Sequence, residues 1–112
     1  MVETTIVMLE EGQVNSMSQN ETKIQKQVQA YIRSIGGYCF KVHGSIYMRA
    51  GIPDVICCID GKFVGIETKD GDNTTSELQL AHGRLINKAG GLFMVAYSVS
   101  DVEEALKSAN II

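Results

Sequence analysis

Residues 54–69 read DVICCIDGKFVGIETK, two apolar runs separated by the pair Asp60-Gly61. This pair between β-rich runs is typical of a two-residue type I′ turn, in which both central residues need positive φ. We therefore expect an antiparallel hairpin in which Ile59 pairs with Lys62. The turn sets the register, so every facing pair along the two strands follows from it.

The open end of this hairpin is expected to carry two facing carboxylates. Counting outward from the turn places Asp54 opposite Glu67, with Cβ atoms about 5 Å apart, and like charges at that spacing destabilise a sheet. Lys69 projects on the same face as Glu67, whereas Thr68 points away, because side chains alternate along a strand. Pro53 fixes φ just before Asp54 and favours an extended approach to the strand.

A divalent cation would remove the repulsion between these carboxylates. Mg²⁺ or Mn²⁺ prefers hard oxygen ligands, which Asp54, Glu67 and the main-chain carbonyl of Thr68 can supply. Such an ion lowers the pKa of a bound water, and Lys69 would position that water or stabilise charge on phosphorus. The alternative is a strand-start Asp54 beside an exposed Glu67–Lys69 pair that contributes under about 1 kcal/mol.

Composition favours one globular domain. The chain has 112 residues, of which 45% are hydrophobic and 21% charged, enough for a modest core. No apolar run approaches the roughly 18 residues needed to span a bilayer, and no signal peptide is evident, so we expect no membrane partner and a cytoplasmic location. The three cysteines are interpreted as buried free thiols.

Charge is distributed unevenly along the chain. Residues 1–21 hold four acids and no base, whereas residues 22–53 hold five bases and no acid. A basic stretch therefore adjoins the carboxylate hairpin, which favours contact with nucleic-acid phosphates. The alternative is a solvated helix face with scattered cations.

Capping signals and periodicity predict the other elements. Ser18 and Glu21 have the spacing of a capping box, and Glu21 is either only that capping carboxylate or a third acid reaching the hairpin. Thr75 or Ser76 is expected to cap a second helix and Ser100 a third. The expected segments are a tail at 1–16 outside a domain at 17–112, helices ending at 35, 89 and 108, and strands at 38–43 and 92–97. The order αβββαβα predicts an α/β fold with a small mixed central sheet flanked by helices.

The motif residues resemble a known family. The PD-(D/E)xK nuclease signature resembles one segment of this chain, which consists of Gly51-Ile52-Pro53-Asp54, twelve further residues and then Glu67-Thr68-Lys69. The longer stretch from about Glu21 to the last strand is similar to the VRR-NUC (virus-type replication-repair nuclease) family. The resemblance implies a restriction-endonuclease-like fold and metal-dependent hydrolysis of phosphodiester bonds in DNA. It implies catalytic roles for Glu21, Asp54, Glu67, Lys69 and Gln79.

A lone domain of this size resembles the stand-alone phage and bacterial members of that family and the archaeal-type Holliday junction resolvases, which act as homodimers. The resemblance therefore implies a homodimer acting on branched DNA, such as four-way junctions or flaps, in a bacterial or phage-infected cell, without a small-molecule cofactor. The alternatives are a catalytically silent DNA-binding module of the same fold and a nuclease acting on linear DNA or RNA. Candidate nucleic-acid contacts are Lys23, Lys26, Lys41, His43, Arg49 and Arg84.

Three aromatic or histidine side chains keep two interpretations each. His43 either contacts phosphate or is an ordinary histidine at a strand end, and His82 is expected to be solvent-exposed or packed on its helix. Tyr47 either stacks on a base at a branch point or is a partly buried loop tyrosine.

Overall fold

The computed structural model describes residues 19–44 and 50–112. The predicted tail at residues 1–16, the predicted capping residue Ser18, and the candidates Tyr47 and Arg49 lie outside these described residues.

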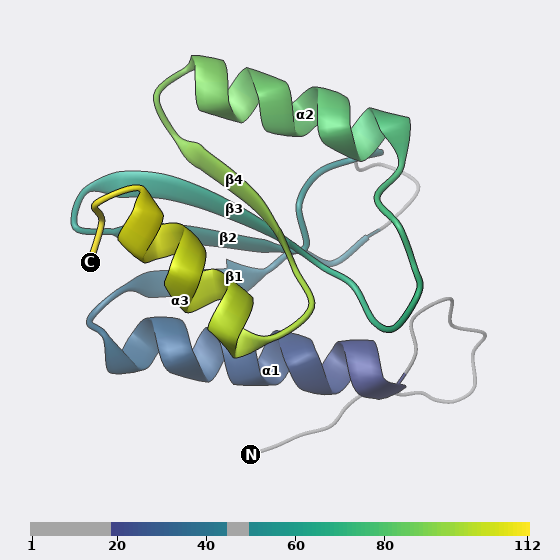
Figure 1. Ribbon diagram of the computed structural model, residues 1–112, viewed down its shortest axis with the longest axis horizontal. Coiled ribbons are helices and arrows are strands. Elements are labelled where there is room, and N and C mark those ends of the chain that lie inside the picture. Colours follow the sequence, from purple (N-terminus) through teal and green to yellow (C-terminus); the bar gives the residue numbers. More distant parts are fainter. Residues whose placement is uncertain (1–18, 45–49) are drawn as a thin grey trace.

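The described elements form a mixed four-stranded sheet with helices on both faces. Strands β1, β2 and β3 pair antiparallel, β4 pairs parallel with β3, and the order across the sheet is β1-β2-β3-β4. Helices α1 and α3 cover one face and α2 lies on the other (Figure 1). The predicted order αβββαβα is confirmed, with bounds α1 (Gln19–Ser34), β1 (Tyr38–Lys41), β2 (Val55–Ile59), β3 (Lys62–Thr68), α2 (Glu77–Lys88), β4 (Leu92–Ala96) and α3 (Val99–Ser108).

The central hairpin has the predicted turn and register. Asp60 and Gly61 have φ values of 51° and 78°, as a type I′ turn requires. Ile59 pairs with Lys62, and the ladder continues to Val55 opposite Ile66 at the start of β2, one pair short of the predicted pairing of Asp54 with Glu67. Local turn chemistry and side-chain alternation were therefore sufficient to predict this part of the fold.

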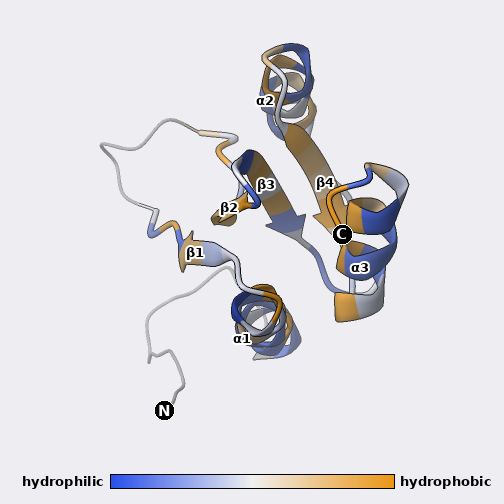
Figure 2. Cartoon of the chain, turned by 90° about the vertical axis from the view of Figure 1, so that its left-hand side faces the viewer, coloured by the Kyte–Doolittle hydropathy of each residue, from blue (hydrophilic) through white to orange (hydrophobic). Residues whose placement is uncertain are grey.

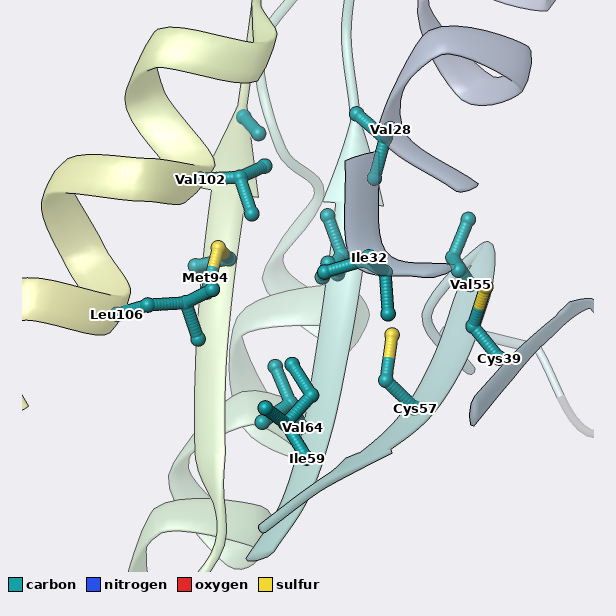
Figure 3. Close-up of a cluster of buried hydrophobic side chains, with 12 residues drawn as sticks. Val28, Ile32, Cys39, Val55, Cys57, Ile59, Val64, Met94, Val102 and Leu106 are labelled. Atoms are coloured by element: carbon teal, nitrogen blue, oxygen red, sulfur yellow. The ribbon is translucent and has the colours of Figure 1, made fainter. Parts of the chain in front are cut away.

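The hydrophobic core lies between the sheet and the two helices α1 and α3. Val64 and Ile66 of β3 are buried in one hydrophobic cluster with Val28 and Ile32 of α1, and Figure 3 shows this cluster between the strands and the two helices. Apolar residues line β4 and the helix sides that face the sheet (Figure 2). This packing holds α1 firmly against the strands, so the N-terminal end of α1 has a defined place relative to the hairpin.

Two predicted details differ from the structure. The third helix is capped by Ser98, not Ser100, because the Ser98 hydroxyl accepts from the Asp101 N–H at 3.2 Å and the Asp101 carboxylate accepts from the Tyr97 N–H at 2.8 Å. The first strand ends at Lys41, two residues earlier than expected. Each boundary thus lies two residues from its predicted position.

The cysteines divide between the two faces of the sheet. Cys39 and Cys57 are buried and face each other across β1 and β2, whereas Cys58 is exposed, so the expectation of three buried thiols is wrong. Adjacent residues of a strand point to opposite faces, which is why Cys57 and Cys58 differ. Within the part of the chain that the structure describes, none of the helices combines the length and apolar character needed to cross a bilayer.

Candidate metal centre

The open end of the hairpin is where the candidate site forms. The end of β3, the start of β2 and the N-terminal ends of α1 and α2 all lie toward the same end of the molecule, on the right of Figure 1. Segments that are far apart in sequence therefore lie at the same end of the molecule as the open end of the hairpin.

Asp54 is fixed by three hydrogen bonds at this end. Its Oδ2 accepts from the Thr68 N–H at 3.0 Å and from the Thr68 hydroxyl at 2.9 Å. Its main-chain carbonyl accepts from the Val42 N–H at 2.7 Å. Asp54 thereby connects the end of β3 with the segment that follows β1.

The orientation of Thr68 differs from the expectation. Its hydroxyl was expected to point away from the site, but it donates directly to Asp54. Asp54 precedes β2 and lies outside the paired ladder, so the strict alternation of facing side chains no longer holds there. The carboxylate of Asp54 consequently reaches the Thr68 side chain.

The residues before Asp54 are positioned by packing. Pro53 is buried, and a Cβ added to Gly65 of β3 would lie 3.0 Å from the Pro53 Cγ. A Cβ added to Gly51 would lie 2.8 Å from the side chains of both Leu78 and His82 of α2. The segment leading to Asp54 is thus held between β3 and α2, and His82 is packed there, as one of its two interpretations predicted.

Glu67 is the most deeply buried acid of the site. Glu67 is only 2% exposed. One oxygen, Oε2, accepts from the Gln79 Nε2 at 2.6 Å and lies 3.3 Å from the Lys69 Nζ. Among the described residues, its other oxygen, Oε1, is buried with no hydrogen-bond partner.

Gln79 links the start of α2 to this acid. Ser76 is the N-cap residue, and Gln79 completes a capping box by accepting from the Ser76 N–H at 2.9 Å through Oε1. The same side chain donates to Glu67 through Nε2. The Gln79 side chain therefore caps the N-terminus of α2 and orients the Glu67 carboxylate at the same time.

The charges of the three acids act on one another. Burial, and then the charge of Asp54, raises the pKa of Glu67 to about 7, although Lys69 acts in the opposite direction and Glu21 adds to the increase. Burial, and then Asp54, likewise raises the pKa of Glu21, with Lys69 opposing. Glu21 therefore belongs to the same electrostatic cluster, which supports its interpretation as a third acid.

Two charged residues join this cluster although neither was predicted as part of the acidic site. Asp70 raises the pKa of Glu21, and Lys41 lowers it, both after the larger effects of burial, Asp54 and Lys69. The position of Asp70 directly after Lys69 was a sequence signal for its proximity. Lys41 was predicted as a nucleic-acid contact, and its place at the end of β1 depends on tertiary pairing.

The predicted basic contacts that the structure describes lie on α1, on or just beyond β1, and on α2. Desolvation, and then the charge of Lys41, lowers the pKa of Lys26, and Lys41 in turn acts on the pKa of Glu21. Lys23 and His43 are exposed on α1 and just beyond β1. Arg84 is exposed on α2, five residues past Gln79 and therefore on a different side of that helix.

The donor set fits a hard divalent cation without forming a complete cage. In residues 19–44 and 50–112, no three His, Cys, Asp or Glu side chains converge closely enough to hold an ion by themselves. Two carboxylates with main-chain and solvent oxygens are nevertheless what Mg²⁺ commonly uses. The buried, unpartnered Oε1 of Glu67 is an oxygen that such an ion would satisfy.

Comparison with solved structures identifies the fold. The chain is similar to a structure described as a VRR_NUC domain, with 24% identity, a TM-score of 0.67 and coverage of 80% of this chain and 97% of the other. A second VRR_NUC domain protein matches with 19% identity, a TM-score of 0.63 and coverage of 82% and 88%.

A third similar structure is Hjc from the archaeal hyperthermophile Archaeoglobus fulgidus, a Holliday junction resolvase. It matches with 16% identity, a TM-score of 0.54 and coverage of 67% of this chain and 65% of the other. No protein-family model and no curated protein sequence matches the chain. These similarities confirm the restriction-endonuclease-like α/β fold of VRR-NUC domains, with an overall arrangement that also resembles the resolvase.

Proposed function

We propose that this protein is a metal-dependent endonuclease that hydrolyses phosphodiester bonds in DNA. The observation that carries the proposal is the state of Glu67, which is buried, oriented through one oxygen, and unpartnered at the other, in an acidic cluster with Asp54 and Glu21. A buried acid cluster of this kind costs stability unless a cation joins it. The similar solved structures are named as VRR_NUC domains and a Holliday junction resolvase, which supports a nuclease acting on DNA.

Asp54, Glu67 and the main-chain carbonyl of Thr68 would hold Mg²⁺ or Mn²⁺. When bound, the ion supplies Lewis-acid stabilisation of phosphoryl charge and a water of lowered pKa. The Thr68 N–H and hydroxyl both donate to Oδ2 of Asp54, so Oδ1 is the oxygen that we assign to the ion.

Lys69 and Gln79 both contact the Glu67 carboxylate and hold it in place. Lys69 has a second role, toward the phosphate of the substrate. Lys69 is partly exposed at the site and carries a positive charge that can stabilise the negative charge developing on the phosphoryl oxygens. Gln79 holds Glu67 in one orientation from the start of α2. Glu21 adds a third negative charge and strengthens the attraction for the ion.

Basic residues beside the acids offer a path for the DNA backbone. Lys23 and Lys26 lie on α1 and Lys41 lies at the end of β1, and the charge of Lys41 acts on Glu21 of the acidic cluster. Phosphate contacts of this kind supply sequence-independent affinity that weakens with salt. His43 is exposed just beyond Lys41 and extends the same surface.

We further propose that the enzyme selects branched DNA and acts as a homodimer. Two symmetric cuts in a four-way junction need two active sites related by a two-fold axis, which a homodimer provides. The similarity to a named Holliday junction resolvase supports this preference.

Cleavage of labelled linear, flapped and four-way DNA tests the function. The wild-type protein should cut in Mg²⁺ or Mn²⁺ but not in chelator, with paired nicks across the four-way junction. Asp54→Asn should reduce the rate by more than about 100-fold, because it replaces a charged ligand by a neutral one.

Matched controls separate catalysis from folding. Asp60→Asn changes the same residue type in the hairpin turn and should cut normally, since Asn also tolerates positive φ. Lys69→Ala should abolish cleavage while DNA binding is retained, whereas Lys62→Ala should have little effect. Binding of DNA without any metal-dependent cutting would identify a silent DNA-binding module instead.

A further inference from the structure

Gln25 of α1 is buried without satisfying its side-chain amide. The residue is 1% exposed, and neither Oε1 nor Nε2 has a hydrogen-bond partner within the described residues. Only one other buried side-chain atom in this part of the chain shares that state, Oε1 of Glu67. Both unsatisfied groups therefore need an explanation, and one of them already belongs to the candidate metal centre.

Packing alone does not account for a glutamine at this position. Val28 and Ile32 occupy the same buried side of α1, so an apolar residue would suit the surroundings. An amide that is buried without partners keeps its full desolvation penalty, whereas an apolar side chain of similar shape avoids it. A residue that lowers stability in this way is expected to have a partner in another functional state.

The position of Gln25 points to that partner. It lies four residues after Glu21, so the two side chains are neighbours on one side of α1. Long helical side chains lean toward the N-terminus of their helix, which directs the Gln25 amide toward the Glu21 turn. The charges of Asp54 and Lys69 at the hairpin end act on Glu21, and Glu21 acts on Glu67.

We propose that Gln25 is a positioning residue for Glu21 in the metal-bound protein, donating from Nε2 to the Glu21 carboxylate directly or through one buried water. This role rests on the proposed metal-dependent function. The hydrogen bond holds Glu21 toward the ion and gives the buried amide its partner. Gln25 itself touches neither the ion nor DNA in this scheme.

Gln25→Met tests the proposal because it keeps length and apolar packing but removes the amide. In chelator, the variant should melt at least about 5 °C above wild type, since an unsatisfied buried group has been replaced. Its dissociation constant for Mn²⁺, measured by calorimetry without DNA, should rise about tenfold. Its kcat on DNA should fall with KM unchanged.

Gln27→Met is the matched control. Gln27 lies on the same helix but is exposed, so this change should leave Mn²⁺ affinity and cleavage as in wild type. A Gln25→Met protein that binds Mn²⁺ and cuts DNA like wild type would overturn the proposal and leave Gln25 as a packing residue.

A measurement on the wild-type protein covers the case in which Gln25→Met folds poorly. The side-chain amide protons of Gln25, assigned by their loss in a Gln25→Ala or Gln25→Met sample, should shift and exchange more slowly with solvent when Mg²⁺ is added. Those of Gln27 should not change. Unchanged Gln25 signals at saturating Mg²⁺ would contradict the inference.

The two proposals fail in different ways. Metal affinity and amide signals are measured without DNA, so they report on Gln25 even if no substrate is cut. Absence of cleavage by wild type, with Gln25 responding to Mg²⁺, would contradict the endonuclease proposal alone.

Discussion

The burial of Glu67 disfavours its charged form, and the same residue is a proposed metal ligand. Its Oε2 is held by Gln79 and Lys69, while Oε1 lacks a partner among the described residues. Burial and Asp54 raise its pKa to about 7 from an ordinary value of 4.5. Below about pH 7 the metal-free folded protein therefore favours the protonated form of Glu67, and a bound cation would favour the charged form.

The free energy of unfolding of the metal-free protein should fall as pH rises from 4.5 to above 7. Over this range the folded state binds more protons at Glu67 than the unfolded state, so the contribution is present at low pH and lost as pH rises through the folded pKa. The loss amounts to at most about 3 kcal/mol. Urea unfolding in chelator at pH 5 and pH 8 measures it.

The control for this pH dependence is Glu67→Gln, which keeps the shape and removes the charge. It should flatten the profile, leaving the smaller contribution of Glu21. Equal pH dependence in the two proteins would show that Glu67 does not titrate as described.

The approach to Asp54 depends on contacts between elements. Gly51 has φ of +88°, and an added Cβ would lie 2.8 Å from side chains of α2. Gly61 in the hairpin turn has φ of +78°, but nothing lies within 4 Å of its added Cβ. The two glycines therefore differ in packing while sharing a backbone conformation that favours glycine.

Gly51→Ala should be clearly more destabilising than Gly61→Ala. Gly61→Ala costs about 1 kcal/mol for the strained backbone, whereas Gly51→Ala should cost at least about 2 kcal/mol, because α2 must also move. Urea unfolding of both variants provides the comparison. The Gly51 change should in addition weaken Mn²⁺ binding, since it displaces Asp54; equal destabilisation by both variants would argue against tight packing on α2.

Over the whole molecule, one part of the sheet is left with exposed aromatic residues. Tyr38 and Phe40 of β1 are 68% and 47% exposed, and Phe63 of β3 is 45% exposed. The register of β1, β2 and β3 puts them on the face opposite α1, beyond the part that α2 packs against. A second copy of the chain is the occupant that the proposed homodimer would bring to this surface.

Light scattering or sedimentation should find a dimer for the wild-type protein. The double variant Tyr38→Ser, Phe40→Ser should shift the equilibrium toward monomer by at least about tenfold, because it removes apolar area at the contact. Arg84→Ser, at an exposed site on α2, should leave the monomer–dimer equilibrium unchanged. A wild-type protein that stays monomeric at high concentration would contradict the dimer.

The sequence by itself determined the hairpin, its register and the order of the elements. These follow from short-range chemistry, namely positive φ at Asp60-Gly61, alternation along strands and a cap at Thr75 or Ser76, which the structure assigns to Ser76. The cap of α3 was predicted wrongly because Ser98 and Ser100 are the same residue type two positions apart, and β1 ends two residues earlier than expected.

Only the tertiary structure decided how the hairpin end is completed. The Thr68 hydroxyl turns to Asp54 because the chain leaves the pleat there, and Gln79 reaches Glu67 because α2 packs back onto the sheet. The burial of Gln25 likewise depends on how α1 lies across the strands. The sequence shows which polar groups the chain contains. Long-range packing decides which of these groups are buried together, because several elements must contribute surface to bury each one.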